Sequence, residues 1–231
     1  RPHEVLPQRC RPSPLSPFRP RLIAALREGI ETLPPTRRAA LQGQVDAWSD
    51  GAPDRGGRPD LYYSVFAALI RAALCGESNP IPMPPLSALA PDELHLVHLA
   101  SWIRLQRLAA AHGSDVPSVS PLIERFRRPD GGYAPDPAAP AQITAAYLAL
   151  NAWQDLDRPL PHPDRLLAFI ESCRMPDGYA NNREWPVAIA PATCAALHIR
   201  AAFDHPPEGD ILAWLAACAQ PRGGFGQIGR A

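Results

Sequence analysis

The sequence predicts an all-α protein built from repeated helical hairpins. Apolar residues recur at the spacing of an α-helix along most of the chain, and no stretch alternates apolar and polar residues as a strand would. A turn motif rich in Pro and Gly that ends in an aromatic residue also returns, at residues 127–133, 175–179 and 220–225. Its copies are 47 residues apart (130 to 177) and then 45 residues apart (177 to 222), a period typical of helical repeats.

The bulk properties of the chain limit its partners. Its 231 residues suffice for one substantial core or one repeat array. Its formal net charge is zero, so neither nucleic acid nor an anionic membrane surface is expected as a partner. No apolar run reaches the roughly 18 residues of a membrane span, and no cofactor is expected. The five cysteines are widely spaced without a CxxC pair, which favours free thiols and a reducing, cytoplasmic location.

Two regions are expected along the chain. Residues 1–20 hold six prolines among polar residues, which is typical of an extended arm or linker that becomes ordered only when it docks. Residues 21–231 form one helical-repeat domain, in which the repeats are clearest over 120–231. The predicted helices cover residues 21–30, 36–48, 61–74, 90–112, 122–126, 141–153, 166–173, 191–203 and 211–218.

Capping and turn residues mark where these helices begin and end. Thr36 is the expected N-cap of the second helix, and Asp60 that of the strongly apolar third helix. The fourth helix opens with acidic residues, which suit the positive end of the helix dipole. In the turn motif we expect the glycines to adopt positive φ, Asp130 and Asp177 to bond the turn backbone, and Tyr133 to pack.

These units resemble the prenyltransferase/squalene-oxidase repeat family, which includes the β subunits of protein prenyltransferases and the class II terpene cyclases. The resemblance is carried by the units at 122–156 and 166–203, the half-unit at 211–231, and the helix that follows residues 57–60. It implies an αα toroid whose inner helices line an apolar cavity that holds an isoprenoid. About nine helices are fewer than a closed ring of this kind usually needs, so the toroid is expected to be incomplete, or the chain to continue past Ala231.

In this family the activity lies at the N-terminal ends of the inner helices, which points to residues 60–64. Protein prenyltransferases have zinc-binding Asp-x-Cys there, but Tyr62 replaces the cysteine. Residues 141–144 and 191–193, where the later zinc-binding histidine would lie, hold no histidine, so zinc is not expected. Class II cyclases use Asp-x-Asp-Asp, of which Asp60 remains while Tyr62 and Tyr63 replace the central pair. A phenol is too weak an acid to protonate an alkene. Asp60, Tyr62 and Tyr63 are the candidate catalytic residues. The alternative is that Asp60 only caps the helix and that the two tyrosines only pack.

Basic side chains and histidines supply further candidates. Bidentate arginine contacts are suited to a diphosphate, although a solvated helix end is the simpler role. The arginines concerned are Arg125, Arg127 and Arg128. His95 and His98 resemble half of a metal site, but no third ligand is evident, so no metal is expected. His198 lies in an apolar run, which is typical of a core histidine.

The resemblance implies a divergent terpenoid-cyclase-like or prenyltransferase-like protein that binds an isoprenoid or other apolar small molecule in a central cavity. The alternative is a non-catalytic scaffold or partner subunit, in which the Pro-rich arm and the unfinished last hairpin contact another protein or a second copy. A third option is one domain of a longer enzyme. The missing zinc ligands and the missing acid pair leave open whether the chain is an enzyme.

Overall fold

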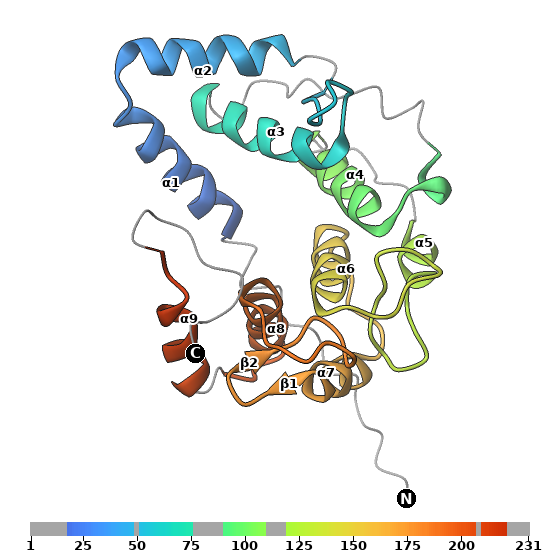
Figure 1. The fold of residues 1–231 in the computed structure, drawn as a ribbon. Coiled ribbons are helices and arrows are strands. Elements are labelled where there is room, and N and C mark those ends of the chain that lie inside the picture. The colour runs from blue at the N-terminus through green and yellow to red at the C-terminus, as the bar shows by residue number, and fades with distance from the viewer. Residues whose placement is uncertain (1–17, 49–50, 76–89, 110–118, 207–208, 221–231) are drawn as a thin grey trace, which may run out of the picture. The chain divides into compact units, whose positions relative to one another are not determined.

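The described part of the chain is all-α apart from one short ribbon, which confirms the predicted fold class (Figure 1). The computed structural model describes residues 18–48, 51–75, 90–109, 119–206 and 209–220. These residues form two compact units, which we call the N-terminal unit (within 15–125) and the C-terminal unit (within 126–231). Most of the predicted Pro-rich arm and the third copy of the turn motif lie outside the described residues.

The N-terminal unit is arranged around the apolar helix α3. Its elements are α1 (Phe18–Glu31), α2 (Pro35–Ala47), α3 (Leu61–Cys75), a 3-10 turn (Pro91–Glu93), α4 (Leu96–Ala109) and α5 (Ser120–Glu124). α3 packs against both α1 and α4. Its C-terminal half joins α1 in a core cluster that includes Ile23, Ile30, Ala72 and Ala73. A helix that is covered on two sides has to be apolar over most of its surface, as α3 is.

Two helix starts differ from the expectation. α2 begins at Pro35, so Thr36 lies inside the first turn and is not the N-cap. Proline suits this first position because the N–H group that it lacks would have no helical partner there. The helix expected from residue 90 begins only at Leu96, because the residues before it form the 3-10 turn and Leu94 adopts an extended conformation.

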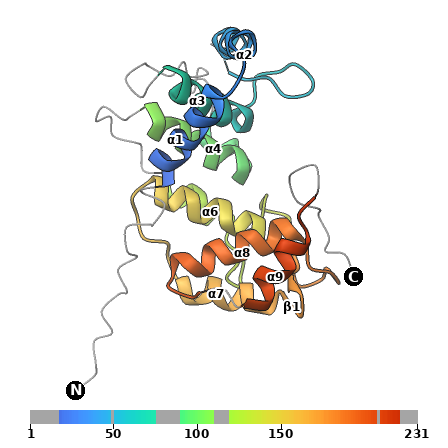
Figure 2. The same cartoon turned by 90° about the vertical axis from the view of Figure 1, so that its left-hand side faces the viewer.

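The C-terminal unit contains the clearest repeats. Its elements are α6 (Ile143–Asp155), α7 (Pro163–Ser172), β1 (Arg174–Met175), β2 (Gly178–Tyr179), α8 (Ala190–Ala202) and α9 (Gly209–Ala217). α8 runs beside α6 and also contacts α7, so it is covered on two sides (Figure 2). β1 and β2 form an antiparallel ribbon of two residues a strand in the turn between α7 and α8. Strands this short leave no alternating pattern in the sequence.

The same main-chain hydrogen bond occurs at the start of three helices, α3, α6 and α8, where each follows a turn. This recurrence supports the repeat predicted from the sequence. In each case the N–H of the residue just before the helix donates to a main-chain carbonyl in the preceding turn. The pairs are Asp60 to Ala52 (2.9 Å) before α3, Gln142 to Tyr133 (2.8 Å) before α6, and Ile189 to Tyr179 (3.1 Å) before α8. The three helices therefore start from their turns in the same way, although α3 belongs to a different unit from α6 and α8.

Two of these junctions share a second bond, to a hydroxyl group one helical turn further on. Ser64 Oγ accepts the N–H of Ala52 at 3.0 Å, and Thr193 Oγ1 accepts the N–H of Tyr179 at 2.9 Å. Both hydroxyl side chains are buried. A buried N–H group needs such a partner, because leaving it unpaired costs the whole of its desolvation free energy.

The turn at 127–133 has the predicted chemistry. Gly131 has a φ of 94°, in the region that favours glycine. Asp130 Oδ1 accepts the N–H of Gly132 at 3.1 Å. Tyr133 is fully buried. The roles predicted for the first glycine, the aspartate and the tyrosine of this copy are confirmed.

The second copy of the turn differs at its aspartate. Gly178 again has a positive φ, of 151°, and Tyr179 is again fully buried. The role predicted for Asp177 is wrong, because its exposed carboxylate accepts no hydrogen bond from any described residue. The main-chain pairing of β1 with β2 closes this turn.

The buried thiol of Cys173 is expected to make the stability of the C-terminal unit sensitive to alkaline pH. It is a buried free thiol, and burial raises its pKa because desolvation of the thiolate outweighs the help of Ser172 and Arg183. The fold therefore favours the neutral thiol. We expect the contribution of Cys173 to the free energy of unfolding to be constant below the ordinary thiol pKa of about 8.5. This contribution should fall as the pH rises above that value.

Urea denaturation at pH 7 and at pH 10 measures this effect. The variant Cys173→Ala removes the titrating group and is expected to lose less stability between the two pH values than the wild type loses. Equal losses in the two proteins would show that Cys173 is not responsible.

Candidate functional site

The candidate site begins with Asp60, the last residue before α3. Its Oδ1 atom accepts the N–H of Tyr63 at 3.1 Å, which confirms the predicted role as helix N-cap. Its Oδ2 atom lies 3.0 Å from Nε2 of His98, in the first turn of α4. The side chains of Asp60 and His98 are 19% and 36% exposed, so the pair is partly shielded from water yet open to a ligand.

Packing of α3 against α4 brings together two residues that are 38 positions apart. Leu96 and Leu99, on either side of His98, are fully buried. Their burial determines how α4 is rotated, and so where the imidazole of His98 points. The sequence singles out Asp60 as an acid and His98 as half of a metal site, but no local signal predicts that they meet.

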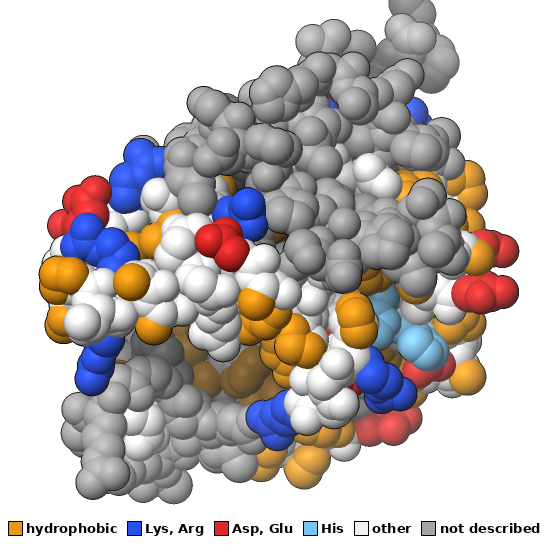
Figure 3. Space-filling view, turned by 90° about the horizontal axis from the view of Figure 1, so that it is seen from above, with side chains coloured by type: hydrophobic (Ala, Val, Ile, Leu, Met, Phe, Trp, Pro, Cys, Tyr) orange, Lys and Arg blue, Asp and Glu red, His pale blue; other side chains and the backbone are white. Residues whose placement is uncertain are grey.

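Three aromatic side chains, Tyr62, Tyr63 and Phe66, form what we call the aromatic cluster on the first two turns of α3. The ring of Tyr62 meets those of Tyr63 and Phe66 edge to face, at centroid distances of 5.5 and 5.1 Å. The three side chains are 40–47% exposed. Hydrophobic and histidine side chains lie near one another on the face drawn in Figure 3. Rings this exposed are available to an apolar ligand.

Ser64, one turn after Asp60, is a structural residue. Its hydroxyl donates to the carbonyl of Asp60 at 2.6 Å and accepts the N–H of Ala52. It lines a pocket between α2 and α3, together with Val45 and Trp48, that has room for about one water molecule. With its hydroxyl bonded in both directions, Ser64 is not poised as a nucleophile.

The residues of the site do not fit a zinc ion. In the ranges that the structure describes, no three His, Cys, Asp or Glu side chains lie where they could hold a metal. Asp60 and His98 supply two donors. His95, whose carbonyl accepts the N–H of Leu99 at the start of α4, is exposed. A tetrahedral zinc site requires three or four protein ligands.

The three arginines proposed for diphosphate binding are engaged by main-chain carbonyl groups. Arg125 donates to Asp92 and Leu94, Arg127 donates to Pro161 at 2.7 Å, and Arg128 donates to Asp136 and Pro137. The guanidinium group of Arg127 also lies 4.5 Å from the ring centroid of Tyr133. These bonds connect loops within each unit and favour structural roles. Diphosphate binding by the arginines stays a prediction.

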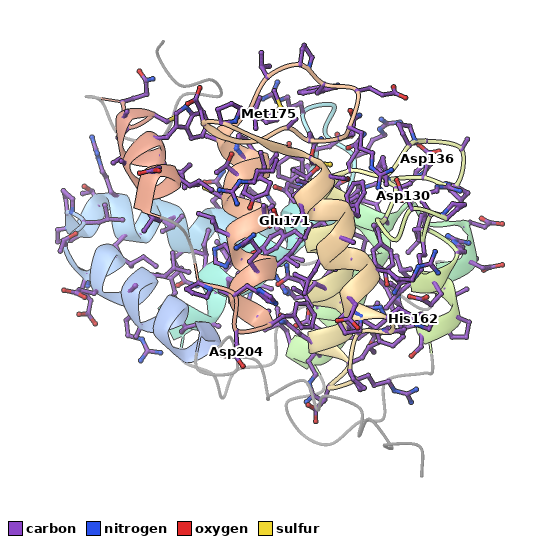
Figure 4. The ribbon with its side chains drawn as sticks, turned by 90° about the horizontal axis from the view of Figure 1, so that it is seen from below. Asp130, Asp136, His162, Glu171, Met175 and Asp204 are labelled. Carbon is purple, nitrogen blue, oxygen red and sulfur yellow. The ribbon has the colours of Figure 1, made fainter. Side chains whose placement is uncertain are left out.

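Glu171, near the end of α7, is the centre of a charged network in the C-terminal unit (Figure 4). It forms an ion pair with Arg200 of α8, and the hydroxyl of buried Tyr179 lies 3.2 Å from the same guanidinium group. A further, longer ion pair joins Glu171 to Arg174 at 3.8 Å. The network connects α7, the following turn and α8, so its role is structural.

His198 corrects the expectation of a core histidine. Its side chain is exposed, and its ring lies 5.6 Å from that of Tyr147 on α6. Cys194 lies one turn earlier on α8, but burial raises the pKa of its thiol. A thiol whose pKa is raised is a poor nucleophile at neutral pH, so Cys194 and His198 do not make a reactive pair.

Comparison with known proteins does not identify the chain. No protein-family model matches it, and no curated protein does. Throughout the described residues, each helix is too short or too polar to cross a lipid bilayer. Any assignment of function therefore depends on the residues of the site.

Proposed function

We propose that this protein binds an isoprenoid or a similarly apolar small molecule on the aromatic cluster, and that the Asp60–His98 pair acts on the bound molecule. The observation that carries this proposal is the exposure of Tyr62, Tyr63 and Phe66 on the first two turns of the helix that Asp60, one member of the partly buried pair, caps. Large exposed aromatic side chains that gather next to ionisable groups are typical of a binding site.

The repeated junctions before α3, α6 and α8 support a helical repeat, on which the proposed likeness to the prenyltransferase/squalene-oxidase repeat family depends. In that family the N-terminal ends of the inner helices carry the site, and α3 begins directly after Asp60, which caps it. The toroid and its central cavity belong to the proposal. The proposal does not require zinc, because an apolar chain is held by ring contacts and the polar pair supplies hydrogen bonds.

Replacing one ring of the aromatic cluster should weaken binding about tenfold, since a half-exposed aromatic side chain covered by a ligand contributes roughly 1–2 kcal/mol. We expect this for Tyr62→Ala and for Phe66→Ala, with geranylgeranyl diphosphate and geranylgeraniol as probes. Titration calorimetry measures the affinity, and native mass spectrometry counts the bound probe. Because the two side chains are exposed, the variants should remain folded.

Leu212→Ala is the matched control, because Leu212 is an equally exposed apolar side chain on α9. This variant should bind both probes as the wild type does. Equal weakening by Leu212→Ala, or no binding of either probe to the wild type, would contradict the proposal. Binding of the diphosphate without the alcohol would also count against it, because recognition would then depend on charge.

A non-catalytic scaffold is the second candidate function. It is favoured by Trp185 and Val187, two large apolar side chains that are exposed in the loop before α8. Exposed tryptophan is a frequent anchor of protein interfaces. The same mass spectra test this candidate: a monomer that carries neither probe nor partner contradicts both functions.

A further inference from the structure

The hydrogen bonds of Asp60 and His98 give the two residues different roles. Each carboxylate oxygen of Asp60 already has a partner inside the protein, since Oδ1 accepts from Tyr63 and Oδ2 faces Nε2 of His98. The second ring nitrogen of His98, Nδ1, bonds no group in the described parts of the chain. The exposed portion of the pair also belongs mainly to His98.

We infer that His98, through Nδ1, exchanges a proton with the bound molecule and that Asp60 is its positioning residue. An ionised carboxylate only accepts hydrogen bonds, so the ring donates its Nε2–H to Asp60 and the lone pair of the neutral ring lies on Nδ1. Hydrolases with a paired Asp and His divide the work in the same way. This inference rests on the proposed function, because the molecule has to be held at the aromatic cluster.

The proton transfer also indicates the class of substrate. Nδ1 takes the proton of an O–H group while that oxygen bonds the carbonyl carbon of an ester, and the imidazolium keeps its Nε2–H on the negative Asp60 carboxylate. The leaving alkoxide departs with the electrons of the broken C–O bond and takes the proton back from Nδ1, which restores the neutral ring. An imidazolium is far too weak an acid to protonate an alkene. The pair therefore suits an apolar molecule that carries a hydroxyl group, such as an isoprenoid alcohol, and not a hydrocarbon that awaits protonation.

Asp60→Asn tests the positioning role without removing the helix cap. Asparagine caps helices as well as aspartate does, so its Oδ1 can still accept from Tyr63 and the melting temperature should change little. Its amide NH₂ then faces Nε2 of His98, which has to become the acceptor, and the proton of the neutral ring moves to Nδ1.

Nitrogen-15 NMR of the histidine-labelled protein reads this tautomer without any ligand. We expect the neutral His98 ring to carry its proton on Nε2 in the wild type and on Nδ1 in Asp60→Asn. A wild-type ring protonated on Nδ1, or the same tautomer in both proteins, would overturn the inference.

The rate of 4-nitrophenyl acetate cleavage is a second measurement. It should not depend on Asp60 and His98 if their role is purely structural. The Nδ1 lone pair attacks the ester carbonyl, 4-nitrophenolate leaves with the electrons of the broken C–O bond, and water hydrolyses the acyl-imidazole to acetate and restores His98. We expect His98→Gln and Asp60→Asn to be about tenfold slower than the wild type, and His95→Gln to match it. Wild-type rates in His98→Gln would refute the inference.

Failure of the proposed function and failure of the role inferred for His98 give different results. If the tautomer switches and the ester rates fall, but geranylgeraniol does not bind, the proposed function is wrong while the pair remains a proton-transfer device. If geranylgeraniol binds but His98→Gln cleaves the ester as fast as the wild type, the proposed function stands and the role of His98 is wrong.

Discussion

Replacing Gly131 with alanine is expected to lower the free energy of unfolding of the C-terminal unit by about 4 kcal/mol. An alanine Cβ at this position would lie 2.4 Å from the carbonyl oxygen of Arg165 and 2.7 Å from its carbonyl carbon. These are main-chain atoms in the first turns of α7, so the clash cannot be relieved by rotating a side chain. The φ of 94° adds strain that glycine avoids. Urea denaturation measures the loss.

Gly57→Ala is the matched control for this substitution. Gly57 also has a positive φ, of 80°, but an added Cβ there would meet open space. It should therefore suffer only the backbone strain, about 1 kcal/mol. Similar losses in the two variants would show that Gly131 is needed for its conformation alone and not for the close approach of α7.

Replacing Thr193 with valine is expected to cost about 2 kcal/mol, the second-largest of the predicted effects on stability. Valine has nearly the same shape, but it cannot accept the N–H of Tyr179, which lies 2.9 Å from the Thr193 hydroxyl. Both residues are fully buried, so water cannot replace the lost partner. Thermal and urea denaturation of the variant measure the cost.

Thr144→Val makes the same chemical change at a more accessible place. The hydroxyl of Thr144 bonds Oδ1 of Asn181 at 3.0 Å, and that oxygen also accepts the N–H of Thr144. Because Thr144 is partly exposed and Asn181 keeps a partner, we expect a loss of only about 0.5 kcal/mol. If Thr144→Val is as damaging as Thr193→Val, the buried hydroxyl has no special part in the junction before α8.

The candidate site shows which roles residue patterns in the sequence can predict and which they cannot. Asp60 could be singled out because it precedes a strongly apolar helix, and its capping bond to Tyr63 confirms that local inference. The diphosphate role of the arginines was predicted from the bidentate geometry of the guanidinium group. A guanidinium group can bond a carbonyl oxygen as well as a phosphate oxygen, and the fold of the neighbouring loop decides whether a carbonyl oxygen lies within reach.

The sequence by itself determined the helices, the repeat and the turn chemistry of Asp130 and Gly131, because periodicity, capping and positive φ depend on residues that are near neighbours in the chain. It also determined that Tyr133 is a core residue. Only the tertiary structure decided that Asp60 meets His98, that the aromatic cluster stays exposed and that His198 leaves the core. These depend on how one helix is rotated against another, and that rotation follows from the packing of whole apolar faces, which no local spacing encodes.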